Sequence, residues 1–317
     1  MSNVKLPKDI YDKLSQKIIG QEELVKELSI LGFLHLARME SREPLTKKET
    51  LLIMGDSGSG KTYSVKALAA ELNIPFVHVN AKEITSSGWA GTDFGDVMKE
   101  VSGQENFAHT LVFIDEFDKV AGNGDTRNDH FTTGTQAALL TALEGGDVRY
   151  SNNKQELVFN TSKMLFILGG AFTQLRKERE NRNQKQSIGF IGEKNDFLGI
   201  VRELEEAGII KEIVGRITSI VETKPTTIDD LKRMVTNPFG LLAQYEAFLP
   251  LYNLRQFELT EEDYAELEER AKKSNTGGRL VDSFIYDKVK NLIFEDAEIL
   301  EPVLGSSTEE EEDCGQE

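Results

Sequence analysis

The sequence predicts an α/β fold in three layers, a parallel β-sheet between two layers of helices, followed by a smaller, mostly helical domain. Up to Arg216, short apolar runs of strand length alternate with segments of helical composition. Strands and helices that alternate in this way form parallel sheets covered on both faces. After Arg216 no comparable series of strands occurs, and helical patterns predominate.

The expected elements follow one another in a regular order. Residues 10–40 form a helical region, because leucines recur there at spacings of three and four, at Leu24, Leu28, Leu31 and Leu34. The expected strands are 49–54, 75–79, 111–114 and 164–168, and the expected helices between them are 63–72 and 135–143. The charge-rich stretch 176–185 (RKERENRNQK) predicts a mobile loop.

These changes along the chain predict three parts. A large domain covers residues 1–222, a small helical domain covers 223–303 with its boundary near Pro225, and an acidic tail covers 304–317. Thr227 and Thr260 each precede acidic residues, as helix N-caps do. The unbroken acidic run near the end of the tail predicts a solvated, disordered segment.

Composition excludes several classes of protein. The chain has 317 residues, of which 39% are hydrophobic, and its net charge is −17. Such an acidic surface repels nucleic-acid phosphates, so we expect no nucleic-acid partner. No apolar stretch reaches the length of about 20 residues that a membrane span needs, and the N-terminus lacks the apolar core of a secretory signal. Cys314, the one cysteine, cannot form an internal disulfide. We therefore expect a cytoplasmic protein that does not bind membranes.

A glycine-rich loop between the first strand and the next helix predicts a phosphate-binding site. Its sequence, GDSGSGKT, matches the pattern GxxxxGK[ST], in which backbone N–H groups surround the β-phosphate. The lysine of this pattern contacts the β- and γ-phosphates, and the following hydroxyl binds Mg²⁺. The expected nucleotide-binding residues are Gly55, Asp56, Ser57, Gly58, Ser59, Gly60, Lys61, Thr62 and Tyr63, with Thr62 also on the metal.

Two acidic residues at the end of a later strand would complete this site. The run LVFIDE places Asp115 and Glu116 where a parallel sheet binds its ligands, at the carboxyl ends of its strands. Asp115 would hold Mg²⁺ through water, and Glu116 would orient or deprotonate the attacking water. Together the two motifs predict a nucleoside triphosphatase with ATP and Mg²⁺ as its cofactors.

An ordered series of motifs resembles a known family. The segments IIGQEE, GDSGSGKT, GWAG, LVFIDEFDKV, LFILGGAF, IGF, EIVGR and TGGR occur in the order and approximate spacing of the AAA+ ATPases of the Clp clade. They look most like ClpX unfoldases and less closely like HslU. The resemblance runs from about residue 12 to residue 300.

The resemblance implies roles for further residues. Ile18 and Ile19 fall where the family packs apolar side chains against adenine, and their alternative role is in the core at a helix entry. Arg216 matches the arginine finger that enters the neighbouring subunit's site, and Arg279 matches the sensor-2 arginine near the γ-phosphate. Without the motifs, each arginine would be expected to form a surface ion pair. Gly169 and Gly170 occupy the sensor-1 position, so we assign no sensor-1 residue.

The resemblance also implies a channel for polypeptide. Trp89, in GWAG, aligns with the aromatic residue of the first pore loop, which grips a translocating chain in a hexameric ring. An aromatic side chain can grip any sequence through contact area and stacking. The alternative is that Trp89 anchors the core. Residues 129–134 (DHFTTG), before the helix at 135–143, would form the second pore loop.

Three departures limit the resemblance. A single cysteine cannot build the N-terminal zinc-binding domain of ClpX. Residues 145–161 lack the basic RKH triplet that helps the family select substrate tags. Ile188, Gly189 and Phe190 match a tripeptide with which ClpX docks on the ClpP peptidase, but they could instead pack into the core near Phe197.

These observations favour an ATP-dependent protein unfoldase that threads polypeptide through a homohexameric ring and delivers it to a ClpP-like peptidase. A stand-alone remodelling or assembly ATPase is the alternative. A nucleotide-switched binding protein that scarcely turns over is disfavoured by Glu116, Arg216 and Arg279.

Overall fold

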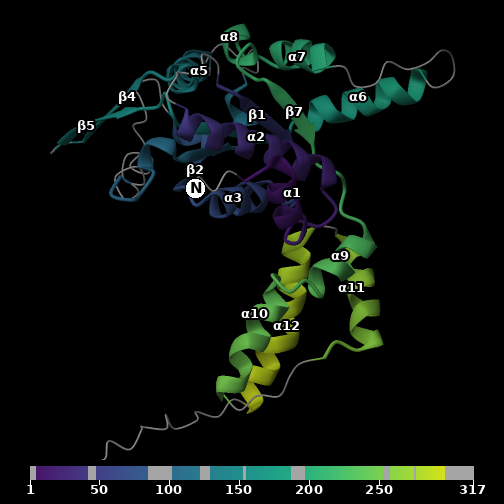
Figure 1. Cartoon of the computed structure of the whole chain (residues 1–317). Coiled ribbons are helices and arrows are strands. Elements are labelled where there is room, and N and C mark those ends of the chain that lie inside the picture. Colours follow the sequence, from purple (N-terminus) through teal and green to yellow (C-terminus); the bar gives the residue numbers. More distant parts are fainter. Residues whose placement is uncertain are drawn as a thin grey trace, which may run out of the picture.

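A five-stranded parallel sheet forms the centre of the large domain (Figure 1). The computed structural model describes residues 5–41, 48–84, 102–121, 129–152, 155–186, 197–252, 258–274 and 276–296. The strand order is β2-β3-β6-β1-β7, and every neighbouring pair is parallel. The strands are β1 (Thr50–Met54), β2 (Phe76–Asn80), β3 (Leu111–Asp115), β6 (Leu165–Gly170) and β7 (Ser219–Glu222). The predicted α/β fold class is confirmed.

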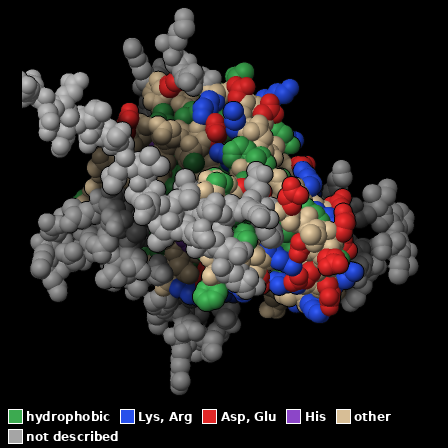
Figure 2. Space-filling model, turned by 90° about the horizontal axis from the view of Figure 1, so that it is seen from below, with side chains coloured by type: hydrophobic (Ala, Val, Ile, Leu, Met, Phe, Trp, Pro, Cys, Tyr) green, Lys and Arg blue, Asp and Glu red, His purple; other side chains and the backbone are tan. Residues whose placement is uncertain are grey.

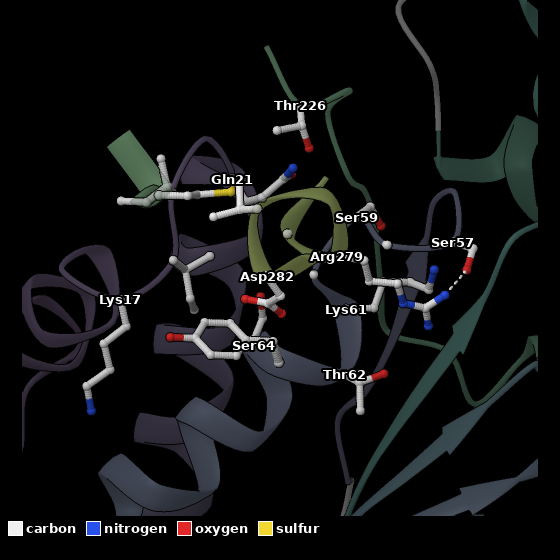
Figure 3. Close-up of a pocket in the computed structure, with 18 of the residues that line it drawn as sticks. Lys17, Gln21, Ser57, Ser59, Lys61, Thr62, Ser64, Thr226, Arg279 and Asp282 are labelled. Atoms are coloured by element: carbon white, nitrogen blue, oxygen red, sulfur yellow. Dashed lines mark hydrogen bonds between the residues drawn. The ribbon is translucent and has the colours of Figure 1, made fainter. Parts of the chain in front are cut away.

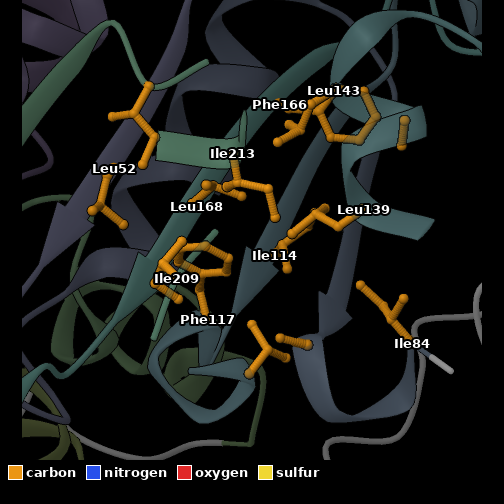
Figure 4. Packing of buried hydrophobic residues seen from close by; sticks show 14 of the residues in the cluster. Leu52, Ile84, Ile114, Phe117, Leu139, Leu143, Phe166, Leu168, Ile209 and Ile213 are labelled. Carbon is orange, nitrogen blue, oxygen red and sulfur yellow. The ribbon is translucent and has the colours of Figure 1, made fainter. Parts of the chain in front are cut away.

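Alternating side chains of the strands bury the two faces of the sheet separately. On one face Ile53, Phe113 and Ile167 pack with α1 (Pro7–Ser15), α2 (Glu22–Glu40) and α3 (Lys61–Leu72). On the other, neighbours such as Ile114 and Leu168 pack with α5 (Asp129–Glu144), α7 (Phe197–Glu206) and α8 (Lys211–Val214) (Figure 4). Because both faces are buried, the three inner strands β1, β3 and β6 are almost continuous apolar runs, as in other parallel sheets covered on both sides.

The C-terminal helices pack around a separate core. They are α9 (Ile228–Val235), α10 (Leu241–Phe248), α11 (Glu261–Lys273) and α12 (Gly278–Asp296), and Leu231, Leu267 and Phe284 are fully buried between them. Thr227 and Thr260 form the predicted N-caps, each within a capping box. In the view from below, acidic and basic side chains are interspersed over the exposed surface (Figure 2). No described helix has the length and apolar character needed to cross a membrane.

One expected loop is a helix instead. Residues 176–185 belong to α6 (Thr173–Gln186), which extends away from the body of the molecule (Figure 1). Arg, Lys, Glu and Gln are good helix formers, so a polar stretch rich in them need not be a loop. Buried Leu175 and Arg179 also attach the start of this helix to the large domain. The prediction of a mobile loop was wrong.

Other elements depart from the expected series. The helical region 10–40 is two helices, and Gly20 between them has a φ of +75°, a left-handed conformation that favours glycine. Residues 129–134 lie within α5, so they are not a loop that precedes a helix. Additional elements are the strand β7, the hairpin of β4 (Asp147–Asn152) and β5 (Gln155–Asn160), and the short helices η1 (Ala81–Glu83), η2 (Phe107–His109), η3 (Phe117–Val120) and η4 (Leu249–Tyr252).

Candidate nucleotide site

The glycine-rich loop joins β1 to α3 and has a backbone that only glycine accommodates easily. Gly58 and Gly60 have φ values of +83° and +88°. A side chain at Gly55 would place its Cβ 1.8 Å from Thr223 Oγ1. The N–H of Gly55 donates to Gly170 O at 3.0 Å, which ties the loop to the end of β6. The loop is therefore held against the carboxyl edge of the sheet.

Lys61 lies inside this loop. Its side chain is buried, and Nζ donates to the carbonyl oxygens of Gly55 at 2.7 Å and Asp56 at 2.9 Å. Burial lowers the pKa of Lys61, although the charges of Asp115, Asp118 and Asp56 act in the opposite direction. The ammonium group is thus placed at the centre of the glycine-rich loop, where a phosphate-binding lysine is needed.

Thr62 and Asp115 bring oxygen atoms together beside Lys61. The Thr62 hydroxyl donates to Asp115 Oδ2 at 3.2 Å. Burial raises the pKa of Asp115, but hydrogen bonds from His78, the Glu116 N–H and Thr62, with the charge of Lys61, outweigh it and hold the pKa below its ordinary value. A hydroxyl and an ionised carboxylate are the ligands that Mg²⁺ prefers, so the residues present fit this metal.

Glu116 follows Asp115 in a left-handed conformation, with a φ of +55°. Its Oε2 lies 2.6 Å from Nζ of Lys82 in η1. The hydrogen bond from Lys82 is the largest cause of a lowered pKa at Glu116, and Asn80 contributes a further hydrogen bond. The carboxylate is ionised and paired with a cation.

Arg279 reaches the same loop from the small domain. Its Nη1 donates to Ser57 Oγ at 3.0 Å, as the dashed line in Figure 3 marks. The backbone of the phosphate loop also lies against the backbone before α12. A Cβ at Gly58 would lie 2.2 Å from Thr276 O, and a Cβ at Gly277 would lie 2.5 Å from Gly58 O. The turn before α12 therefore packs directly on the phosphate loop.

A cavity of about 770 Å³ connects these groups. Its phosphate end contains Lys61, Thr62 and Arg279 (Figure 3). Away from that end the cavity is lined by Ile18, Ile19 and Tyr63, as expected from the sequence. It is also lined by residues that the sequence did not predict, namely Lys17, Gln21, Met234, Asn237, Phe239, Leu241, Gln244, Val281 and Asp282. A cavity with a polar end and an apolar end suits a nucleotide.

Gln21 could have been found from the sequence, since it belongs to the IIGQEE segment. Its side chain donates to Lys224 O and accepts from Lys224 N, both at 2.8 Å. It thereby attaches the start of α2 to the chain that enters the small domain. The residues from α9 and α10 carry no motif, and only the fold brings them to the cavity.

Arg216 does not line this cavity. It follows α8, its side chain is half exposed, and it pairs with Glu144 at the end of α5 rather than with the cavity of its own chain. Trp89 and the tripeptide Ile188, Gly189 and Phe190 lie outside the described residues.

Comparisons with known proteins agree with this geometry. Residues 51–192 match the family described as "ATPase family associated with various cellular activities (AAA)". The ATP-dependent Clp protease ATP-binding subunit ClpX of Borrelia duttonii is 30% identical over 319 residues, which cover 91% of this chain and 74% of that protein. The chain belongs to the ClpX family of AAA+ ATPases.

Two further relatives extend over a similar part of the chain. ClpX 2 of Wolinella succinogenes is 29% identical, with coverage of 93% of this chain and 78% of that protein. ClpX of Treponema denticola is 28% identical, with coverage of 92% and 77%. Membership of the ClpX family makes the chain an ATPase, as the two nucleotide-binding motifs predicted.

Proposed function

We propose that this ClpX-family ATPase is a protein unfoldase, which works as a homohexameric ring and binds ATP with Mg²⁺ in the cavity between its two domains. The observation that carries the proposal is the convergence of Lys61, Asp115 and Arg279 on one cavity. Lys61 and Asp115 come from the large domain and Arg279 from the small one. Phosphates bound between them would therefore join the two domains.

Each polar group of the site has a step to perform. Lys61 and Arg279 bind the phosphates. Thr62 and Asp115 would hold Mg²⁺, which would supply neutralisation of the phosphate charge. Glu116 accepts the proton of the attacking water, and release of its carboxylate from Lys82 would make it a stronger base for this step. Ile18, Ile19 and Tyr63 contact the base and ribose at the less polar end of the cavity.

Arg216 acts on a neighbouring subunit in this proposal. Its exposed position and its separation from the cavity of its own chain support that role. A guanidinium group offered to the γ-phosphate of the next subunit offsets the charge that develops during transfer. Hydrolysis then depends on the assembled ring.

Trp89 carries the mechanical part of the function. In the ring, the segment that contains Trp89 lines the axial channel and grips an extended polypeptide. This segment begins shortly after η1, whose Lys82 contacts Glu116. A pull on the segment is therefore exerted close in the sequence to Lys82, the ion-pair partner of Glu116.

A ClpP-type peptidase is the proposed downstream partner. Ile188, Gly189 and Phe190 follow α6, which extends away from the body of the molecule and would present them for docking. A stand-alone remodelling ATPase is the second candidate. It is favoured by residues 145–161, where the hairpin of β4 and β5 lacks the basic RKH triplet.

Two variants separate these functions. Trp89→Ala should retain ATPase activity and lose unfolding of a stable, tagged fluorescent protein, whereas the matched Trp89→Phe should keep part of it. Phe190→Ala should retain ATPase activity and unfolding but lose degradation in the presence of a ClpP-type peptidase. Phe197→Ala, which truncates a described exposed aromatic residue in α7, is the control.

The outcomes differ for each candidate. If Trp89→Ala unfolds the client at the parent's rate, Trp89 does not grip the chain. If Phe190→Ala loses ATPase activity, Phe190 belongs to the core. If the peptidase has no effect on any form, including the parent, the stand-alone remodeller is the better account.

A further inference from the structure

The phosphate loop contains an acidic side chain, Asp56, in a segment that has to bind a polyanion. We propose that Arg176 is a positioning residue that neutralises Asp56 and thereby sets the affinity of the loop for ATP. This inference rests on the proposed ATP site. Arg176 is separate from the residues that the nucleotide motifs predict, since it lies in α6.

The two side chains form a close ion pair. Arg176 Nη1 donates to Asp56 Oδ1 at 2.7 Å. The Arg176 side chain is 12% exposed and that of Asp56 is 65% exposed. The guanidinium group is thus held among protein atoms, while the carboxylate is largely exposed to solvent. In this arrangement α6 brings the cation to the loop.

The backbone before α6 explains why Arg176 reaches the loop. Gly170 O accepts the N–H of Gly55, so β6 ends beside the start of the loop. A Cβ at Gly170 would lie 2.5 Å from the ring of Phe172, and the missing side chain lets this ring pack against Phe117. Phe172 has a φ of +44°, and its carbonyl accepts the N–H of Arg176 in the first turn of α6. The turn between β6 and α6 therefore determines where the guanidinium group lies.

Both charges act on the lysine of the loop. The charge of Asp56 raises the pKa of Lys61, and the charge of Arg176 lowers it. The two side chains are therefore close enough to the phosphate-binding ammonium group to influence it, with opposite signs. Without Arg176 the carboxylate of Asp56 would lose this ion-pair partner, and its negative charge would oppose the binding of an anion more strongly. At the separations found within one site, a unit charge changes the affinity for an anion by about tenfold.

The ion pair between Arg176 and Asp56 has two alternative roles, which the same variants distinguish from charge neutralisation. If the ion pair only tethers α6 to the loop, replacement of either partner should change the affinity for ATP in the same direction and to the same extent. If Arg176 contacts the phosphates directly, its loss should be harmful whether or not Asp56 is present. Only charge neutralisation predicts that replacement of Arg176 lowers the affinity for ATP and replacement of Asp56 raises it. These two changes should cancel when both residues are replaced.

The experiment measures the equilibrium Kd for ATP of the full chain at low and high salt, with the melting temperature of each protein. The variants are Arg176→Gln, Asp56→Asn and the double replacement. Lys177→Gln is the matched control, because it removes the same charge from the exposed side of α6 one residue away. Parent protein and Lys61→Ala are measured in parallel.

We expect Arg176→Gln to weaken ATP binding by about tenfold, Asp56→Asn to tighten it several-fold, and the double variant to bind like the parent. The differences should shrink at high salt, because mobile ions screen the charges. Equal weakening in both single variants, or a double variant as weak as Arg176→Gln, would overturn the inference. A parent that does not bind ATP would instead refute the proposed nucleotide site.

Discussion

The ammonium group of Lys82 lies 2.6 Å from the carboxylate of Glu116. Glu116 is the residue expected to activate water, and the hydrogen bond from Lys82 lowers its pKa. A carboxylate stabilised in its ionised form by a cation is a weaker base, and Asn80 adds a further hydrogen bond that lowers the pKa of Glu116. The structure thus shows Glu116 paired with a cation that weakens it as a base.

The first prediction follows from this pair. Lys82→Met should raise the ATPase rate in the absence of a protein client, because Glu116 is released and its pKa returns toward the ordinary value. The check is steady-state phosphate release, with Lys66→Met on the exposed side of α3 as the control. A rate that falls as far as in Glu116→Gln would mean that Lys82 takes part in catalysis.

Arg216 and Glu144 provide the second prediction. Arg216→Ala should bind ATP normally but hydrolyse it at least about a hundredfold more slowly, since a charge opposite the transferred group is lost. Glu144→Gln removes only the partner of Arg216 within its own chain and should retain hydrolysis. Rings that mix Arg216→Ala with Glu116→Gln subunits should regain activity. No recovery in rings shown to be mixed would indicate that Arg216 acts within its own subunit.

Gly58 gives the third prediction. Gly58→Ala should weaken ATP binding by about tenfold or more, because a left-handed φ costs a side chain about 1–2 kcal/mol and Cβ would meet Thr276 O. Gly199→Ala is the control, since a Cβ there meets nothing within 4 Å and the site is helical. The measurement is the Kd for ATP together with the melting temperature. Parent-like binding by Gly58→Ala would show that the loop and the turn before α12 separate easily.

The fourth prediction concerns pH and stability. His35 is buried, with Nε2 at 3.0 Å from His109 O. Burial, assisted by the nearby charges of Arg38 and Lys48, lowers the pKa of His35 to about 4. In the unfolded chain an ordinary histidine takes up its proton near pH 6.5. The unfolded chain therefore binds more protons than the native state between these values.

The free energy of unfolding should consequently fall as the pH decreases from about 6.5 to about 4, by up to about 3 kcal/mol from this group. Denaturant titrations across this range test the sign and the size. His35→Leu should be less dependent on pH than the parent over the same window, whatever its absolute stability. An equal dependence in both proteins would assign the effect to other groups.

Local patterns predicted much of the fold. β1, β3 and β6 were recognisable because each is a short apolar run buried on both faces, and β2 at the edge of the sheet was recognised although it is only partly buried. β7 was missed because its residues, SIVE, are only partly apolar, and the sheet rather than the sequence selects them. The helix α6 was missed because its polar composition gives no periodic signal, whereas buried Arg179 pairs with Glu203 and Glu222 from distant segments.

The residues of the site also fall into two groups, those that belong to a sequence motif and those that only the fold brings to the cavity. Lys61, Thr62, Asp115 and Glu116 belong to motifs with a chemical pattern, and the structure brings them together. Met234, Val281 and Asp282 carry no such pattern, because they reach the cavity only when the small domain packs on the large one. The partners Lys82 and Arg176 were not predicted either. Each is a single charged side chain whose role depends on where a short turn places it.

The central claim is that ATP hydrolysis in this cavity drives protein unfolding. The most direct measurement follows the fluorescence of a stable fluorescent protein that carries an unstructured tag, mixed with the full chain and ATP. The parent should abolish the fluorescence when ATP is present, and Glu116→Gln should bind ATP yet leave the client folded. Parent protein that hydrolyses ATP at a normal rate while every tagged client keeps its fluorescence would contradict the account.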